Sequence, residues 1–351
     1  MSDPPPVSVV MAVHNEERYV TGAVESILGQ SFADFEFLIV DDASTDGTPG
    51  LLEAFAVRDP RIRILTNPTN LGLTKSLNVA LTAARGHLVA RMDADDLSFP
   101  PRLERQVGFL QDNADYLLCG TGYQTIDENG RVQKTDIRGA TPSLFEWDLF
   151  FGPPLAHPSA MFRRLLPDGL PVLYDETLLT AQDYGLWCTL AKRGKGVVLP
   201  EVLVGYRMHS TNISTTKRGS QAELSIRIAR DFLEFKLPGV LERHPQLLAF
   251  YALYHGQLHT RPEHVAPSFE AVQSLADEFI RRDCLNAAEK RIVRRLALRR
   301  LVRALFAEGQ GRRSFSVVVA TLRALVPHLP VFLEEGHDFV RRRLVGVPRP
   351  R

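Results

Sequence analysis

Short apolar runs alternate with segments of helical periodicity over the first hundred residues. Apolar positions three and four apart predict helices between the apolar runs, and Ser, Thr or Asp residues introduce the second of these helices. The runs themselves, rich in β-branched residues, predict strands at 7–13, 35–42, 61–67 and 87–96. Strands that alternate with helices at this spacing predict a parallel α/β sheet covered on both faces.

The pattern changes twice further along the chain. Between about residues 115 and 215 the apolar runs are short and Gly/Pro-rich loops separate them, which predicts mixed strands that complete the same domain. From about residue 217 helical periodicity dominates. We therefore expect an α/β domain over residues 1–215 and a mainly helical C-terminal extension over residues 216–351.

Composition narrows the class of protein. Hydrophobic residues make up 44% and charged residues 24%, values typical of a globular protein. The three cysteines lie far apart and predict no disulfide framework. The N-terminus lacks the signal-peptide pattern, and no apolar run reaches the roughly 18 residues of a membrane span. We expect a cytoplasmic protein.

The charge distribution is uneven. Residues 281–351 hold 17 Lys or Arg and only 6 Asp or Glu, so the rest of the chain is acidic. Residues 291–306 predict a basic amphipathic helix, which either contacts anionic lipid at the inner face of the membrane or packs on the protein with its arginines in water. No known nucleic-acid-binding motif accompanies the arginines, and we expect no nucleic-acid partner.

Three aspartates crowd into the sequence RMDADD at the end of the fourth predicted strand. Carboxylates this close repel one another unless a cation is present. Oxygen ligands suit Mg²⁺ or Mn²⁺, which normally takes its remaining ligands from substrate phosphates. The alternative is a polar turn that caps the helix beginning near Arg102.

The position of other polar residues favours the metal interpretation. Ligands of open α/β sheets bind beyond the carboxyl ends of the strands. The ends of the first three predicted strands carry His14, Asn15, Asp41, Asp42 and Asn67.

These motifs together resemble the family-2 glycosyltransferases of bacterial type. The resemblance covers roughly residues 7–210 and rests on VSVVMAVHNEE, FEFLIVDDASTDGT, NLGLTKSLNVAL and DADD in that order. It implies a GT-A fold with a central mixed, mostly parallel sheet. It also implies transfer of a hexosyl or N-acetylhexosaminyl group, with inversion, from a nucleotide sugar (UDP suits best) to a carbohydrate or lipid-linked glycan. The fingerprint G-x-G-x-x-G of nicotinamide and flavin enzymes is absent after the first strand.

The resemblance places donor binding after the first three strands. Asp42 corresponds to a carboxylate that accepts a hydrogen bond from the base or ribose. Taken alone, Asn15 could also cap the following helix, and Lys75 could equally be a solvated side chain. The implied donor contacts in these segments are Val13, His14, Asn15, Glu16, Asp42, Asn67 and Lys75.

The DADD segment corresponds to the metal-binding motif of the family. The resemblance implies that Asp93, Ala94 and Asp95 line the donor site, with Asp93 and Asp95 near a divalent cation (Mn²⁺ or Mg²⁺) on the diphosphate. Which of the crowded aspartates binds the metal stays open. Arg207 and His209 correspond to a segment that folds over the phosphates, and His209 is a candidate metal ligand, although a lone histidine is usually structural.

The segment TLLTAQDYGLWCTLAKRG resembles the catalytic segment of the family. It implies that Asp183 is the general base that deprotonates the acceptor hydroxyl. An N-cap of the following helix is the alternative role for Asp183. Gln182 stands where an acid is commoner, and with His157 it is expected on the acceptor side.

Two other functions remain open from the sequence. A sugar nucleotidyltransferase also combines an α/β sheet, metal and carboxylates, but it should carry a Gly/Arg-rich loop after the first strand, which VMAVHNEE lacks. A catalytically inactive relative that serves as a scaffold is the non-enzymatic alternative. Retention of the aspartates and of Asp183 argues against it.

Overall fold

The structure, a computed structural model, describes residues 3–209, 218–257, 261–283 and 285–305. The chain divides into two compact units, residues 1–232 and residues 233–351. The expected domain boundary between residues 215 and 216 lies outside the described residues. So does the last part of the basic tail, residues 306–351.

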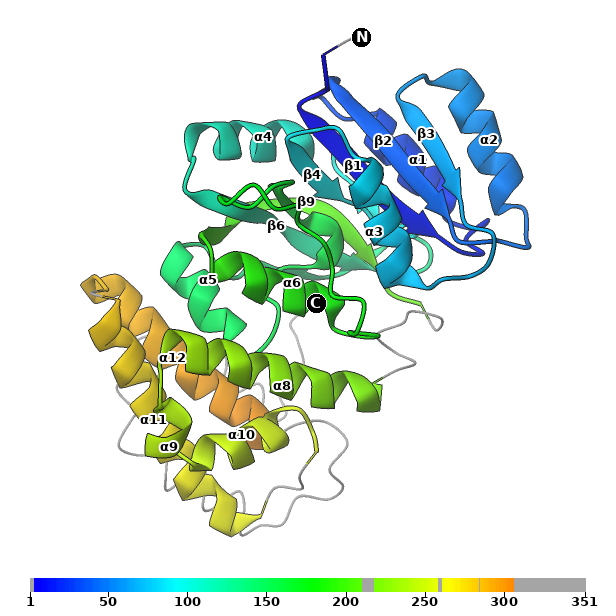
Figure 1. Cartoon of the computed structure of the whole chain (residues 1–351). Coiled ribbons are helices and arrows are strands. Elements are labelled where there is room, and N and C mark those ends of the chain that lie inside the picture. The colour runs from blue at the N-terminus through cyan, green and yellow to red at the C-terminus, as the bar shows by residue number, and fades with distance from the viewer. Residues whose placement is uncertain (1–2, 210–217, 258–260, 284, 306–351) are drawn as a thin grey trace. The chain divides into compact units, whose positions relative to one another are not determined.

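The first half of unit 1 is a parallel sheet whose strands pair in the order β3-β2-β1-β4. These strands are β1 (Val7–Val13), β2 (Phe35–Asp41), β3 (Ile62–Thr66) and β4 (Leu88–Arg91). The connecting helices are α1 (Val20–Leu28), α2 (Thr48–Arg58) and α3 (Leu73–Ala83) (Figure 1). All four predicted strands are confirmed, but β4 ends at Arg91, so the aspartates lie in the loop that follows it.

The second half of the sheet is mixed, as predicted. Strand β8 pairs antiparallel with both β4 and β6, whereas β6 and β9 pair in parallel. The short β5 and β7 add antiparallel edges to β9 and β6. These strands are β5 (Leu97–Ser98), β6 (Tyr116–Ile126), β7 (Val132–Asp136), β8 (Met161–Arg163) and β9 (Lys195–Arg207). The helices are α4 (Arg102–Asp112), α5 (Pro142–Leu149), the 3₁₀ turn η1 (His157–Ser159) and α6 (Gln182–Ala191). Helix α8 (Arg218–Lys236) begins in unit 1 and ends in unit 2.

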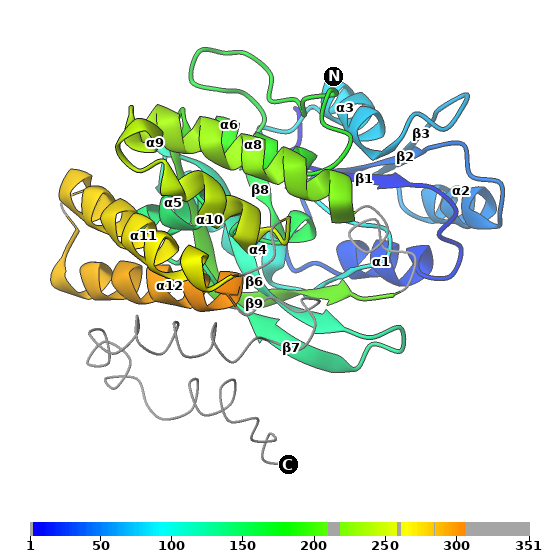
Figure 2. The same cartoon turned by 90° about the horizontal axis from the view of Figure 1, so that it is seen from below.

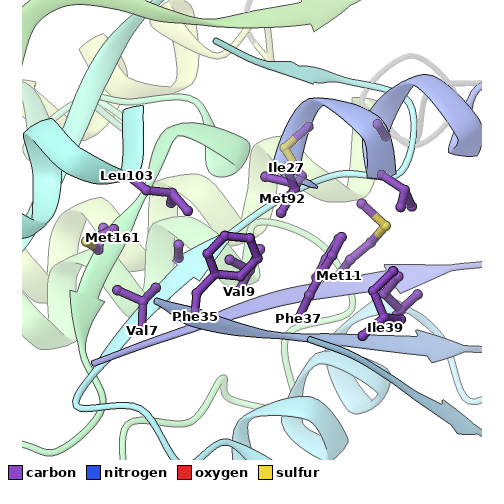
Figure 3. Close-up of a cluster of buried hydrophobic side chains, with 14 of the residues drawn as sticks. Val7, Val9, Met11, Ile27, Phe35, Phe37, Ile39, Met92, Leu103 and Met161 are labelled. Atoms are coloured by element: carbon purple, nitrogen blue, oxygen red, sulfur yellow. The ribbon is translucent and has the colours of Figure 1, made fainter. Parts of the chain in front are cut away.

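Alternate residues of β1 and β2 build the core on one face of the sheet. They meet apolar side chains from α1, α4 and β8, and all are buried (Figure 3). Burial of each such side chain stabilises the fold by roughly 1.5–3 kcal/mol. The labelled members are Val7, Val9, Met11, Ile27, Phe35, Phe37, Ile39, Met92, Leu103 and Met161. This packing fixes the strand ends, and therefore the loops that carry the predicted site.

Unit 2 is helical in its described residues, as the periodicity predicts. Its helices are α9 (Val240–Arg243), α10 (Gln246–Tyr254), α11 (Pro262–Arg282) and α12 (Ala287–Leu305). Helices α11 and α12 lie side by side (Figure 2). None of the described helices is long and apolar enough to cross a membrane.

Helix α12 contains most of the predicted basic amphipathic helix. Its apolar residues Val293 and Leu301 are buried, whereas Arg291 and Arg303 are exposed. The apolar side of α12 therefore packs within unit 2, and among the described residues its arginine side is the more exposed one.

Candidate functional site

Backbone strain is concentrated beside the predicted site residues. Among the described residues, three non-glycine residues have positive φ: Asn15 (55°), Ala43 (58°) and Ala181 (56°). This conformation costs an L-residue roughly 1–2 kcal/mol. Ala43 follows Asp42 directly, and Ala181 stands two residues before Asp183. Such strain persists where the surrounding structure holds a loop in one conformation, which is common at functional sites.

Asp42 is buried at the end of β2 and held by the loop before α3. Its Oδ1 accepts hydrogen bonds from Asn67 Nδ2 (2.8 Å) and the Leu71 N–H (2.8 Å), and its Oδ2 accepts one from the Gly72 N–H (2.8 Å). Gly72 has φ +86°, which brings the two successive N–H groups onto the carboxylate. Burial would raise the pKa of Asp42, but these hydrogen bonds outweigh burial and hold the pKa below its ordinary value.

The loop after β1 packs beside Asp42. His14 Nδ1 hydrogen-bonds with the Asp42 carbonyl (2.8 Å), and Asn15 Oδ1 accepts from the Thr45 N–H (2.8 Å). Helix α1 begins after Tyr19, so Asn15 does not cap it and the capping interpretation is wrong. Val13 is buried at the end of β1, and Lys75 is exposed in the first turn of α3.

The three aspartates after β4 have different partners. Asp93 Oδ1 accepts from Arg91 Nη2 (2.5 Å), and Asp95 Oδ2 lies 2.9 Å from His209 Nε2. Asp96 is fully buried, and its Oδ1 accepts from the Arg207 N–H (2.6 Å). Asp96 Oδ2 has no hydrogen-bond partner in the described part of the chain. Ala94, between Asp93 and Asp95, is buried.

The acids of this loop are electrostatically crowded. Burial raises the pKa of Asp93 and Asp96, and the charge of Asp95 raises both further. Glu16 joins the group from the β1 loop: burial, and then the charge of Asp95, raise its pKa to about 7. Burial and mutual repulsion thus disfavour the ionised carboxylates here, and a bound cation would favour them.

Arg207 anchors the aspartate loop. Its Nε donates to the Asp95 carbonyl (2.7 Å), and its Nη1 lies 3.2 Å from the carbonyls of Asp127 and Glu128. The guanidinium also stacks on the Tyr19 ring (4.8 Å to the centroid). Arg207 therefore lies next to the predicted donor site, where its side chain fixes the backbone of the aspartate loop and of residues 127–128.

Asp183 lies in the first turn of α6. The N-cap position belongs to Ala181, so the capping interpretation of Asp183 is wrong. Burial raises the pKa of Asp183, the Tyr184 N–H lowers it, and the charge of Asp93 raises it further. Gln182 is buried beside it at the first helical position. The charge of Asp93 acts on Asp183, so the two carboxylates are close enough to influence each other.

His157, in the turn η1, lies near helix α6, which carries Asp183. Its Nε2 hydrogen-bonds with the Tyr174 hydroxyl (2.7 Å), and its ring centroid lies 6.0 Å from that of Trp187 in α6. Burial, and then the charge of Arg91, hold the pKa of His157 well below its ordinary value. His157 is therefore a neutral imidazole at pH 7.

Three residues that take part in this site were not predicted from the sequence. Arg91 and Tyr174 are buried and interact with each other, and Arg91 pairs with Asp93. Asn78 of α3 fixes the Tyr174 backbone by donating to its carbonyl (3.0 Å) and accepting from its N–H (2.9 Å). Arg91 had a detectable signal, because a charge inside a predicted buried strand requires a partner. The Asn78–Tyr174 pair had none, since the two residues are 96 positions apart.

Comparison with known sequences identifies relatives over most of unit 1. The sequence model of glycosyl transferase family 2 matches residues 8–166. The putative glycosyltransferase EpsE of Bacillus subtilis (strain 168) is 38% identical over 219 residues, which cover 60% of this chain and 76% of EpsE. The O-antigen biosynthesis glycosyltransferase WbnJ of Escherichia coli is 32% identical over 219 residues, which cover 60% of this chain and 82% of WbnJ.

Comparison with solved structures supports the same fold. Residues 1–349 of S. aureus TarS, crystallised in complex with UDP-GlcNAc, match with a TM-score of 0.55 at 20% identity, over 85% of this chain and 88% of that one. The fold is therefore of GT-A type, as the sequence resemblance implied. The extent and identity of the match to EpsE establish the family, and this chain belongs to glycosyl transferase family 2.

Proposed function

We propose that this glycosyltransferase moves a sugar from a nucleotide-sugar donor, a UDP-sugar in the first instance, to a hydroxyl of a glycan or lipid-linked glycan, with inversion at the anomeric carbon. The observation that carries the proposal is that a hydrogen-bonded Asp42 and a crowded aspartate loop follow β2 and β4 at their carboxyl ends, while the charge of Asp93 in that loop acts on the half-buried Asp183. We assign Asp42 to the nucleotide, the aspartate loop to the diphosphate and Asp183 to the acceptor.

The nucleotide is assigned to the ends of β1, β2 and β3. An ionised carboxylate accepts a hydrogen bond from the N–H of uracil or from a ribose hydroxyl, and Asp42 is held in that state. His14 and Asn15 border it, and Asn67 holds it. Lys75 supplies a cation near the phosphates. The complex of TarS with UDP-GlcNAc supports UDP as the first nucleotide to test.

A divalent cation is assigned to Asp93, Asp95 and His209. The described residues hold no ready cluster of three or more candidate metal ligands. The donor set still suits Mn²⁺ or Mg²⁺, because the carboxylates raise one another's pKa and a nucleotide-bound ion takes its other ligands from phosphate. When bound, the cation would neutralise the charge that develops on the leaving diphosphate.

Asp183 is assigned as general base. Its carboxylate takes the proton of the acceptor hydroxyl, the oxygen attacks the anomeric carbon, and the bond from that carbon to the diphosphate oxygen breaks on the opposite face. A single displacement of this kind inverts the configuration. A pKa raised by burial brings the base closer to neutral pH, where proton transfer is more favourable. His157 and Gln182 are placed to orient the acceptor.

The arginine side of α12 supports peripheral contact with anionic lipid. Arg291 and Arg303 are exposed there, and a lipid-linked acceptor would lie at such a surface.

The test is incubation of the protein with UDP-, GDP- and dTDP-sugars, Mn²⁺ and a panel of sugar acceptors. Release of nucleoside diphosphate together with a glycosylated product of inverted configuration is expected. Release of pyrophosphate would indicate nucleotidyl transfer instead, and a product of retained configuration would exclude the single displacement.

A further inference from the structure

Arg91 is a buried cation that the proposed mechanism leaves without a role. Its side chain, at the end of β4, is 0% exposed. It donates to the Met92 carbonyl and to Asp93 Oδ1 (2.5 Å). Its Nε has no hydrogen-bond partner among the residues that the structure describes. A buried guanidinium is unfavourable unless charged or polar groups surround it, so its position requires an explanation.

The backbone of Arg91 joins it to the acceptor side. The Arg91 N–H donates to the Ala160 carbonyl (2.9 Å), directly after η1, which carries His157. His157 in turn hydrogen-bonds with the Tyr174 hydroxyl. Strand β4 therefore brings Arg91 beside η1, whose His157 lies against Trp187 of α6.

Side-chain contacts link the same guanidinium to helix α6. Besides its bond to Asp93, Arg91 interacts with the side chain of Tyr174, whose hydroxyl hydrogen-bonds with His157. The His157 ring in turn lies against that of Trp187 in α6, with 6.0 Å between the centroids. Helix α6 carries Asp183 in its first turn. A planar guanidinium can orient two acceptors at fixed angles, which a lysine ammonium cannot.

We propose that Arg91 is a positioning residue that couples the donor side of the site to the general base. Its guanidinium holds Asp93 directly and, through Tyr174 and His157, fixes helix α6 so that Asp183 is oriented to receive the acceptor proton. The inference rests on the proposed function, because it assigns Asp183 the role of base.

The test compares R91M, R91K and a control, R163M, with wild type. Arg163 is on β8, the strand next to β4, and its guanidinium donates to the backbone carbonyls of Leu110, Asn113 and Tyr116. For each protein we would measure the melting temperature, the affinity for UDP with Mn²⁺, and kcat and KM for UDP release from the UDP-sugar that wild type uses.

We expect R91M to lower kcat by roughly 100-fold, because a base displaced by about 1 Å loses that much rate, while KM for the donor changes less than about fivefold. R91K, which keeps the charge without the planar fork, should recover part of the loss and remain about tenfold below wild type. R163M should melt at a lower temperature and keep the kcat of its folded fraction.

The outcomes separate this inference from the proposed function. If wild type releases no UDP from any UDP-sugar, the proposed function fails and the inference fails with it. If wild type is active and both Arg91 variants keep wild-type kcat per folded molecule, Arg91 is only structural and the inference alone is overturned. If R91M does not fold, folded R91K decides: a kcat equal to wild type overturns the proposal, and a tenfold loss supports it.

Discussion

The acidic ends of β2 and β4 hold their charge in opposite ways. At the end of β2, two backbone N–H groups and an amide surround Asp42, and its pKa lies below the ordinary value. After β4, burial and mutual repulsion raise the pKa of Asp93 and Asp96. Hydrogen bonds from the protein stabilise the carboxylate of Asp42, whereas the surroundings of Asp93 and Asp96 disfavour their ionised forms. A carboxylate that recognises a neutral base needs the first arrangement, and a carboxylate that binds a cation needs the second.

The largest expected effect comes from Asp183, which belongs to neither region. D183N preserves the size of the side chain but removes the base, so kcat should fall by roughly 10²–10⁴-fold. Affinity for UDP should change less than about twofold, because Asp183 is not assigned to the donor. Rates of UDP release and calorimetric titration of UDP check this prediction. D175N, at an exposed aspartate of the same segment, is the control. Turnover of D183N at the wild-type rate would contradict the assignment.

D95N, in the aspartate loop after β4, should have two measurable effects. With Mn²⁺ present, UDP affinity should fall by about 10–100-fold, because one proposed metal ligand is weakened. Without metal, the melting temperature should rise, because Asp95 raises the pKa of both Asp93 and Asp96 and its neutralisation removes that repulsion. Exposed D112N serves as the control. Metal-independent UDP binding in wild type would count against the assignment of a cation here.

The pH dependence of kcat should report Asp183. Only the carboxylate form can accept the proton, and burial places its pKa above the ordinary value. Activity should therefore be full above that raised pKa and fall about tenfold per pH unit below it. Initial rates between about pH 8 and about pH 4, with UDP affinity measured in parallel, test this prediction. A kcat that stays level down to the ordinary range of an aspartate would be inconsistent with it.

D42N should weaken the hydrogen bonding at the end of β2. An asparagine offers one acceptor oxygen in place of two, and its NH₂ group faces the N–H donors of Leu71 or Gly72. We expect a loss of about 1–3 kcal/mol in the free energy of unfolding and weaker UDP binding. Chemical denaturation measures the first effect, and D34N at an exposed position is the control. D42N should therefore lower stability, whereas D95N without metal should raise it. A change of the same sign in both variants would contradict the contrast between the end of β2 and the aspartate loop after β4.

The smallest effect concerns the arginine side of α12. Replacement of Arg291, Arg294 and Arg303 by Glu should weaken binding to vesicles of phosphatidylglycerol by about 1 kcal/mol per residue or more, since each cation near an anionic surface contributes about that much. Replacement by Lys should preserve binding. Sedimentation with vesicles measures it, and equal binding to purely zwitterionic vesicles would rule out an electrostatic contact.

Much of the site could be predicted because its residues follow local patterns. The apolar runs placed β1, β2 and β3 within about a residue, and the carboxyl-end rule brought Asp42 and the aspartates to one edge. The hydrogen-bond and ion-pair partners of those residues could not be predicted from the sequence. Asp93 pairs with Arg91, Asp95 with His209 and Asp96 with the Arg207 backbone, and two of these pairs join residues more than 100 positions apart.

The sequence alone determined the alternation of strands and helices, the acidic strand ends and the family of the chain, because each depends on neighbouring residues or on an ordered set of motifs. Only the tertiary structure decided that β8 follows β4 in the sheet, and that Arg91 therefore lies beside η1 while its side chain pairs with Asp93. It also decided that the apolar side of α12 is buried within unit 2. The physical reason is that periodicity shows which face of an element is apolar, whereas the neighbour that covers it depends on the order in which the whole chain packs.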